Sequence, residues 1–283
     1  HPGEPVGRNA NRIGGAKFTL NGVTYELAKN SAEVNNLHSG PDYYRDRIWD
    51  AEVEETALGT TITFGLHSPD GDQGYPGNAD ITVSYTLTPD NCLKLDYHMV
   101  SDADTIANFT NHVYFNLGGY KSGSALDQKV WIDADYFTAT DANSIPTGEL
   151  VAVKGTPMDF TEMKPIGRDI QEDYQALKYG NGYDHNWALN HPAGELSLSA
   201  KAEDEKTGRT MEVYTDLPGV QFYTANSLKT ERGKNHAVYT PRCGYCFETQ
   251  YFPDAINKPE FASPVIKAGE EYKTTTIYKF GVK

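Results

Sequence analysis

Alternation of apolar and polar residues is the main pattern of this chain, and it predicts β-strands. Two consecutive segments show it most clearly, because their apolar residues occupy every second position: Ile81, Val83, Tyr85 and Leu87, then Leu93, Leu95, Tyr97 and Met99. The turn formers Pro89-Asp90-Asn91 separate the two segments. Asn21-Gly22, the strongest short hairpin signal, separates two more, residues 16–20 and 23–27. The sequence therefore predicts antiparallel hairpins.

Further strands are expected along the rest of the chain, at residues 51–55, 60–66, 129–132, 150–154, 185–189, 195–202, 209–215, 220–224, 245–250 and 272–280. Residues 68–78 form a long loop rich in Gly, Asp and Pro, with Tyr75 as its one large side chain. Only residues 161–177 suggest a helix. Short strands, turn-rich links and almost no helix predict an all-β sandwich or barrel. Because there is no linker, low-complexity tract or internal repeat, we expect one domain over residues 1–283.

The segment Asn108–Leu117 is predicted to be a strand with one apolar face and one polar face. The polar face would carry five neutral hydrogen-bonding side chains with His112 in the middle. Such a row suits a small polar ligand, and histidine readily gives or takes a proton near neutral pH. The alternative is a structural histidine in a satisfied polar ladder, because buried polar groups usually find partners.

Composition and charge exclude several classes of partner. The net charge of −14 and the pI near 5.0 argue against nucleic acid and against anionic membrane surfaces, which attract basic patches. No apolar run approaches the ~20 residues of a membrane span, and no signal peptide is recognised.

Cys243 and Cys246 have the spacing of a redox or zinc pair, but no second pair accompanies them. With Cys92 they are read as reduced thiols of a cytoplasmic protein.

Several classes of reaction are excluded because their motifs do not occur in the sequence. No Gly-x-Ser-x-Gly elbow, phosphate loop or dinucleotide fingerprint occurs. A zinc site from His38, His112 and His185 is conceivable, but their spacing is arbitrary. Asp184 could be a turn residue, and Glu248 is unusual because it lies within an apolar strand. Histidine and carboxylate acid–base chemistry on a neutral polyol is what remains.

Seven motifs in order resemble the galactose mutarotase, or aldose 1-epimerase, family: Gly7-Arg8-x-x-Asn11-Arg12, Asn36-Leu37-His38-x-Gly40, Asp70-Gly71-x-x-Gly74-Tyr75-Pro76-Gly77, Asn111-His112-x-Tyr114-Phe115-Asn116-Leu117, Tyr183-Asp184-His185, Gly219-x-Gln221-x-Tyr223-Thr224 and Glu248-Thr249-Gln250-x-Phe252-Pro253-Asp254-Ala255. Each motif alone is weakly specific, whereas seven in register are strongly so. The resemblance runs from about Gly7 to Phe280, essentially the whole chain.

The resemblance implies a large antiparallel β-sandwich of the galactose mutarotase type and interconversion of the α and β anomers of free aldoses. It assigns Glu248 as general base and His112 as general acid. It assigns sugar binding to Arg12, Asn11, His38, Asp184 and Gln221. It implies a monosaccharide substrate, with no metal and no cofactor, and it leaves the oligomeric state and the preference between galactose and glucose open.

One departure from the family pattern concerns the start of the chain. Family members usually carry several dozen residues, forming strands, before the Gly-Arg-x-x-Asn-Arg motif, which here begins at residue 7. We therefore expect those N-terminal strands to be lacking, which would expose a sheet edge. Two alternatives remain: an epimerase of hexose phosphates, which would need more basic residues around its pocket, and a sugar-binding module without catalysis.

Overall fold

The structure is a computed structural model that describes residues 3–283, and it divides the chain into two compact units. The first unit comprises Gly3, His112–Thr249 and Tyr278–Lys283. The second comprises Glu4–Asn111 and Gln250–Ile277. The last strand, β24 (Glu271–Val282), contributes residues to both. The expectation of a single domain stays a prediction.

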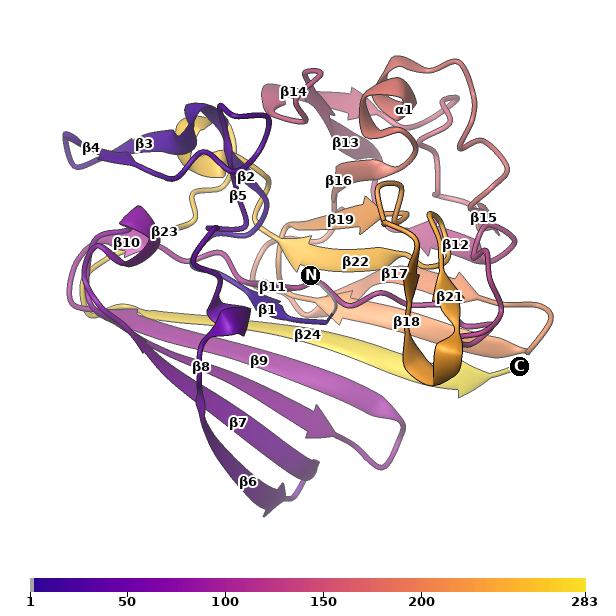
Figure 1. Cartoon of the computed structure of the whole chain (residues 1–283), viewed down its shortest axis with the longest axis horizontal. Coiled ribbons are helices and arrows are strands. Elements are labelled where there is room, and N and C mark those ends of the chain that lie inside the picture. Colours follow the sequence, from indigo (N-terminus) through magenta and orange to yellow (C-terminus); the bar gives the residue numbers. More distant parts are fainter. Residues whose placement is uncertain (1–2) are drawn as a thin grey trace. The chain divides into compact units, whose positions relative to one another are not determined.

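The first unit contains the strands that carry most of the candidate site. Five of them form a sheet in the order β14-β13-β16-β19-β22, and others form a run in the order β15-β12-β17-β18 (Figure 1). Its elements are β12 (Lys129–Ile132), β13 (Tyr136–Thr140), β14 (Pro146–Ala152), β15 (Lys164–Pro165), α1 (Gln175–Gly180), β16 (Asp184–Ala188), β17 (Ser197–Glu203), β18 (Arg209–Thr215), β19 (Gly219–Tyr223), β20 (Glu231–Arg232), a 3₁₀ turn (Lys234–His236), β21 (Val238–Tyr239) and most of β22 (Cys246–Gln250).

The side chains of this five-stranded sheet separate into an aromatic face and a polar face. Trp187, Phe222 and Phe247 come from three adjacent strands and pack ring on ring, with Phe222 and Phe247 stacked at 5.1 Å between centroids. Each such ring buries about 150–250 Å². Because successive residues of a strand point to opposite faces, Gln221 and Glu248 lie on the other face. The aromatic core therefore determines which side of the sheet presents the polar residues.

The second unit contains a run of four hairpin-linked strands, in the order β9-β8-β7-β6 (Figure 1). Its elements are β1 (Pro5–Val6), β2 (Arg12–Ile13), β3 (Lys17–Leu20), β4 (Val23–Glu26), β5 (Asn36–Leu37), β6 (Asp50–Thr56), β7 (Gly59–Ser68), β8 (Ala79–Leu87), β9 (Cys92–Ser101), β10 (Thr105–Ile106), β11 (Thr110–Asn111), β23 (Val265–Ile266) and 3₁₀ turns at Gly14–Ala16, Tyr44–Asp46, Asp72–Gly74 and Ala255–Asn257. The β8–β9 register places the two predicted apolar sets opposite each other, for example Val83 against Tyr97.

A buried arginine organises the long loop of the second unit. Arg8, in the first of the seven motifs, is fully buried. Its guanidinium donates to the backbone oxygens of Pro76 and Gly77 and to Oγ of Ser68, at 2.8, 3.0 and 2.7 Å. These bonds hold the loop at residues 68–78, whose Tyr75 ring is completely buried. Hydrogen bonds from a buried cation to several loop oxygens compensate its desolvation.

The all-β class with very little helix is confirmed, but two local predictions were wrong. In the segment 108–117 only Thr110–Asn111 is a strand. Beyond it, Phe115 forms an isolated bridge with Tyr245, and the N–H of Leu117 donates to the side chain of Gln128. Asn and Gln side chains that bond the backbone compete with a regular ladder. Residues 161–177 contain turns and β15, and helix begins only at Gln175.

Within residues 3–283, no helix combines the length and apolar character needed to cross a membrane.

Candidate active site

The seven residues assigned to the site fall into two groups, one in each unit. The first unit holds His112, Asp184, Gln221 and Glu248, and the second holds Asn11, Arg12 and His38. All except Arg12 and Asp184, which are partly exposed, are buried.

A single β-bridge sets the position of His112 against strand β22. The backbone of Phe115 exchanges hydrogen bonds of 2.8 and 3.0 Å with that of Tyr245, in antiparallel orientation. Antiparallel register pairs residues that move in opposite directions along the two segments. Three residues further along each segment, the same register brings His112 opposite Glu248. The bridge therefore explains how a residue outside any strand meets one inside β22.

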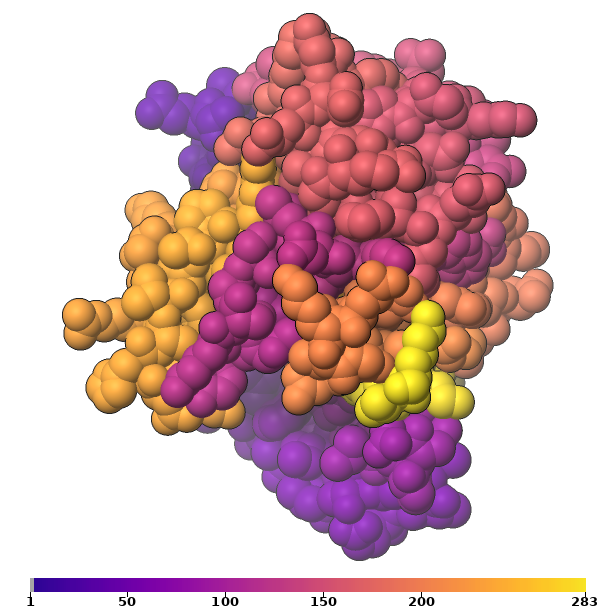
Figure 2. All heavy atoms as spheres, turned by 90° about the vertical axis from the view of Figure 1, so that its right-hand side faces the viewer, coloured from indigo at the N-terminus to yellow at the C-terminus, as the bar shows by residue number. Residues whose placement is uncertain are grey.

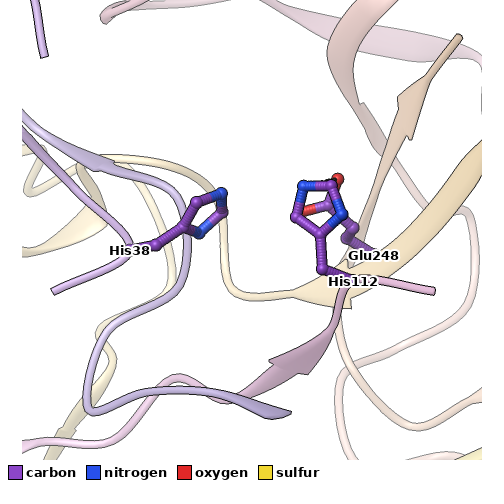
Figure 3. A group of neighbouring side chains, drawn as sticks. All are labelled: His38, His112 and Glu248. Atoms are coloured by element: carbon purple, nitrogen blue, oxygen red, sulfur yellow. Dashed lines mark ion pairs between the residues drawn. The ribbon is translucent and has the colours of Figure 1, made fainter. Parts of the chain in front are cut away.

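His112 and Glu248 form the closest acid–base pair of the first unit's group (Figure 3). Nε2 of His112 lies 3.5 Å from Oε1 of Glu248, and their side chains are 6% and 3% exposed. A proton-transfer group must lie within hydrogen-bond reach of its target or close to it, and such distances often shorten when substrate binds. The pair can therefore supply a proton donor and a proton acceptor at one point.

Asp184 and Gln221 form a second pair on the same polar face of the sheet. The side-chain amide of Gln221 donates to Oδ1 of Asp184 at 2.7 Å. Asp184 is the first residue of β16, paired with Tyr223, so it lies in the sheet rather than in the turn before it. Within residues 3–283, Oε1 of Gln221 and both polar atoms of the neighbouring Asn186 are buried without a hydrogen-bond partner. Because such groups normally have partners, this face has unused hydrogen-bonding capacity.

Two tyrosines and a cysteine surround the imidazole of His112. The ring of Tyr114 lies 5.1 Å from it and that of Tyr223 lies 6.1 Å from it, between centroids. Burial, with the nearby charge of Asp184, raises the pKa of Tyr223 to about 12, and burial raises that of Tyr114 still further. Sγ of Cys246 lies 3.5 Å from Nδ1 of His112. Both tyrosines are therefore neutral phenols near neutral pH.

These three residues were missed as site residues, although the sequence contained a signal for one of them. Cys246 lies two positions before Glu248, so both point to the same face of a strand. The approach of Tyr114 and Tyr223 to His112 depends on the long-range bridge and on sheet pairing, which no local pattern encodes.

A cavity of about 810 Å³ lies beyond these tyrosines within the first unit. Tyr114 and Tyr223 contribute to its lining. The rest of the lining comes largely from residues 113–123 and 227–239, the magenta and light orange segments that lie side by side in Figure 2.

In the second unit, the backbone of Asn11 orients the ring of His38. The N–H of Asn11 donates to Nδ1 of His38 at 3.0 Å, and the N–H of His38 donates to the carbonyl of Asn11 at 2.9 Å. Since Nδ1 accepts, the neutral ring carries its proton on Nε2, the other nitrogen drawn in Figure 3. Asn11 and His38 both adopt left-handed backbone conformations, with φ of 60° and 53°. Strain of this kind costs about 1–3 kcal/mol per residue and is characteristic of functional sites.

Arg12 is anchored through its backbone. It pairs with Leu37 between strands β2 and β5, and its carbonyl accepts from the N–H of Asp254 at 2.9 Å. Among the described residues, its Nε is buried with no hydrogen-bond partner. A buried guanidinium nitrogen without a partner is a candidate donor to a ligand.

His185, one of the three histidines considered for a zinc site, has an ordinary structural environment. Its Nδ1 accepts from the backbone N–H of Asp184 at 3.1 Å, and its ring meets the rings of Phe137 and Trp187 edge to face.

Comparison with known proteins identifies a family across almost the whole chain. A family model described as aldose 1-epimerase matches residues 1–279. The galactose mutarotase of Sus scrofa is 41% identical over 285 residues, which is 100% of this chain and 80% of that protein. The aldose 1-epimerase of Escherichia coli is 35% identical over 280 residues, covering 98% and 79%.

Solved structures show the same fold. The GalM/aldose epimerase homologue from C. elegans superposes with a TM-score of 0.88 at 25% identity, covering 99% of this chain and 82% of that one. Galactose 1-epimerase from Lactobacillus acidophilus superposes with a TM-score of 0.87 at 27% identity, covering 99% and 80%. These likenesses confirm the predicted β-sandwich of the galactose mutarotase type.

Proposed function

We propose that this chain, which belongs to the aldose 1-epimerase family, interconverts the α and β anomers of free hexoses, galactose or glucose, by opening and reclosing the sugar ring. The observation that carries the proposal is the buried pair of His112 and Glu248, with Nε2 and Oε1 3.5 Å apart. Opening a hexose requires one proton to leave O1 and another to reach O5. Both oxygens are bonded to C1, so the acid and the base must lie close together.

In the proposed reaction Glu248 is the base and His112 is the acid. The carboxylate of Glu248 takes the proton of the C1 hydroxyl, the C1–O5 bond breaks as the C1 carbonyl forms, and the imidazolium of His112 protonates O5. Rotation about C1–C2 presents the other carbonyl face. O5 then adds to C1, His112 recovers its proton, and Glu248 returns a proton to O1. Acid–base assistance of this kind contributes about 10²–10⁴-fold.

The remaining residues are proposed to hold the hydroxyls of the sugar. For Asp184 and Gln221, the support is the 2.7 Å hydrogen bond between them and the buried Oε1 of Gln221. For Asn11, Arg12 and His38, the support is the buried Nε of Arg12 and the Nε2–H of His38. Hydrogen bonds to fixed donors and acceptors orient a small polar ligand.

A cytoplasmic location is part of the proposal. All three cysteines, which lie within the described residues, are thiols and not disulfides, as is usual for proteins in a reducing compartment.

Polarimetry on freshly dissolved α-galactose and α-glucose tests the function. The chain should accelerate mutarotation well beyond the spontaneous rate, whereas the Glu248→Gln variant should not. Glucose 6-phosphate serves as a third substrate, because acceleration confined to it would indicate a hexose-phosphate epimerase. Calorimetric binding of galactose without any acceleration would indicate a sugar-binding module, and either result would overturn the proposal.

A further inference from the structure

The imidazole of His112 contacts the same strand through both of its nitrogens. Nε2 lies 3.5 Å from Oε1 of Glu248, and Nδ1 lies 3.5 Å from Sγ of Cys246. Because Cys246 and Glu248 are two residues apart in β22, their side chains point to the same face. Cys246 is completely buried, so bulk water does not compete for Nδ1.

The thiol remains protonated in this environment. Burial raises the pKa of Cys246 well above its ordinary value, and the negative charges of Glu248 and Asp184 raise it further. A protonated thiol is a weak hydrogen-bond donor and a weak acceptor. In many enzymes the second nitrogen of a catalytic or metal-binding histidine donates instead to a carboxylate or a backbone carbonyl, which stabilises the charged ring.

We propose that Cys246 is a positioning residue for His112, which orients the imidazole through Nδ1 while stabilising its charged form only weakly, so that Nε2 readily releases its proton. This inference rests on the proposed function, because it assigns a consequence to the acid role of His112. When His112 gives up its Nε2 proton, Nδ1 keeps its own, and the sulfur accepts that weak hydrogen bond before and after the transfer.

The other titratable groups of the first unit that face His112 are consistent with this role. Tyr114 and Tyr223 lie beside the ring and are neutral, because burial raises the pKa of both phenols. Glu248 faces Nε2, and the charge of Asp184 acts on both Tyr114 and Cys246. Within this unit the two carboxylates therefore supply the negative charge around the ring, and Cys246 supplies a neutral contact at Nδ1.

Two substitutions and a matched control separate this role from simple packing. In Cys246→Ser the hydroxyl is a stronger acceptor of similar shape, so the charged ring should be stabilised. We expect the alkaline limb of the kcat–pH profile to move up by about half to one pH unit and kcat on its plateau to fall by roughly 3–10-fold. In Cys246→Ala the orienting contact is lost, and kcat should fall by about tenfold with KM nearly unchanged. Cys243→Ser makes the same exchange at the other cysteine of the motif, and we expect the wild-type profile.

Nitrogen NMR of the free protein gives a test that does not depend on turnover. In ¹⁵N-histidine-labelled protein the Nδ1 and Nε2 shifts report which nitrogen of His112 carries the proton, and Cys246→Ser should shift the Nδ1 resonance while Cys243→Ser should not. If the protein does not accelerate mutarotation but Cys246→Ser shifts the Nδ1 resonance, the proposed function is excluded and the contact between Cys246 and His112 is supported. If folded Cys246→Ser has an unchanged alkaline limb and an unchanged Nδ1 resonance, the inference is wrong. These two readouts decide it even if Cys246→Ala does not fold.

Discussion

The side-chain amide of Gln221 donates a 2.7 Å hydrogen bond to Oδ1 of Asp184, and this bond joins two neighbouring strands on the polar face of their sheet. Gln221 is itself buried, and within the described residues its Oε1 has no hydrogen-bond partner. An ionised carboxylate can accept about four hydrogen bonds, so Asp184 has capacity for sugar hydroxyls after binding Gln221. The amide also restricts the orientation of the carboxylate, which favours a binding role.

Asp184→Asn should weaken sugar binding by roughly 1–3 kcal/mol, because hydroxyls would meet a neutral acceptor in place of a charged one. The amide oxygen can still accept from Gln221, so the local fold should persist. Calorimetry with 1-deoxygalactose, which cannot mutarotate, measures the affinity directly. Asp173→Asn is the control, since that side chain is 87% exposed. Equal affinities for wild type and Asp184→Asn would leave Asp184 with only a structural role.

Glu248→Gln should lower kcat by about 10²-fold or more and change KM far less. Glutamine keeps the shape of the side chain and removes the proton acceptor. Polarimetric initial rates over a range of galactose concentrations give kcat and KM separately. Glu149→Gln, on the exposed surface of β14, should behave as wild type. Near-normal kcat in Glu248→Gln would exclude it as the base.

His112→Asn should abolish most of the activity and change the shape of the pH profile. The proposed reaction needs an ionised Glu248 and a charged His112 in the same molecule, so the wild-type kcat–pH profile should be bell-shaped. Asparagine can donate a hydrogen bond but cannot deliver a proton from a charged ring, and the alkaline limb should therefore disappear from the residual rate. His67→Asn, at a side chain 61% exposed, should retain the bell. If His112→Asn also keeps the bell and most of the rate, another group is the proton donor, and His38 is the next to test.

Lys164→Ala should lower the free energy of unfolding by roughly 2–4 kcal/mol. The Lys164 side chain is 1% exposed, and its Nζ donates to the carbonyl of Pro157 and to Oδ2 of Asp169, both at 2.7 Å. Alanine would leave that carbonyl without its buried donor. Urea unfolding measures the change. Lys201→Ala, where the side chain is 40% exposed and 4.0 Å from Glu212, should cost less than about 0.5 kcal/mol. Equal costs for the two variants would contradict the prediction.

Stability should also depend on pH through Asp169. The hydrogen bond from Arg168 lowers the pKa of Asp169, burial opposes this, and Lys164 lowers the pKa further. A carboxyl group whose pKa is lower in the folded state stabilises the fold above its unfolded pKa of about 3.9 and loses that contribution as the pH falls through the folded value. Urea unfolding between about pH 5 and about pH 2 should therefore show a smaller loss of stability for Asp169→Asn than for wild type. Parallel curves would show that Asp169 contributes nothing to the dependence.

Strand positions could be predicted from the sequence because alternation is a local property. The apolar sets that include Val83 and Tyr97 specify both their own strands and the shared face on which they meet. The Asn21-Gly22 turn likewise specifies its hairpin, whose strands pair from Lys17–Glu26 to Leu20–Val23. The seven ordered motifs, with their acidic, basic and histidine side chains, could also be identified from the sequence, and they indicated the family. The roles of the individual site residues stay predictions.

Only the tertiary structure decided which of these residues meet. His112 faces Glu248 because one bridge, Phe115 to Tyr245, fixes the register of two segments far apart in sequence. The segment 108–117 is not a continuous strand, because its backbone bonds to several separate partners. Arg8 is buried because loop carbonyls from residues 68–78 converge on it. Local periodicity carries no information about such contacts, since each depends on groups that only the folded chain brings together.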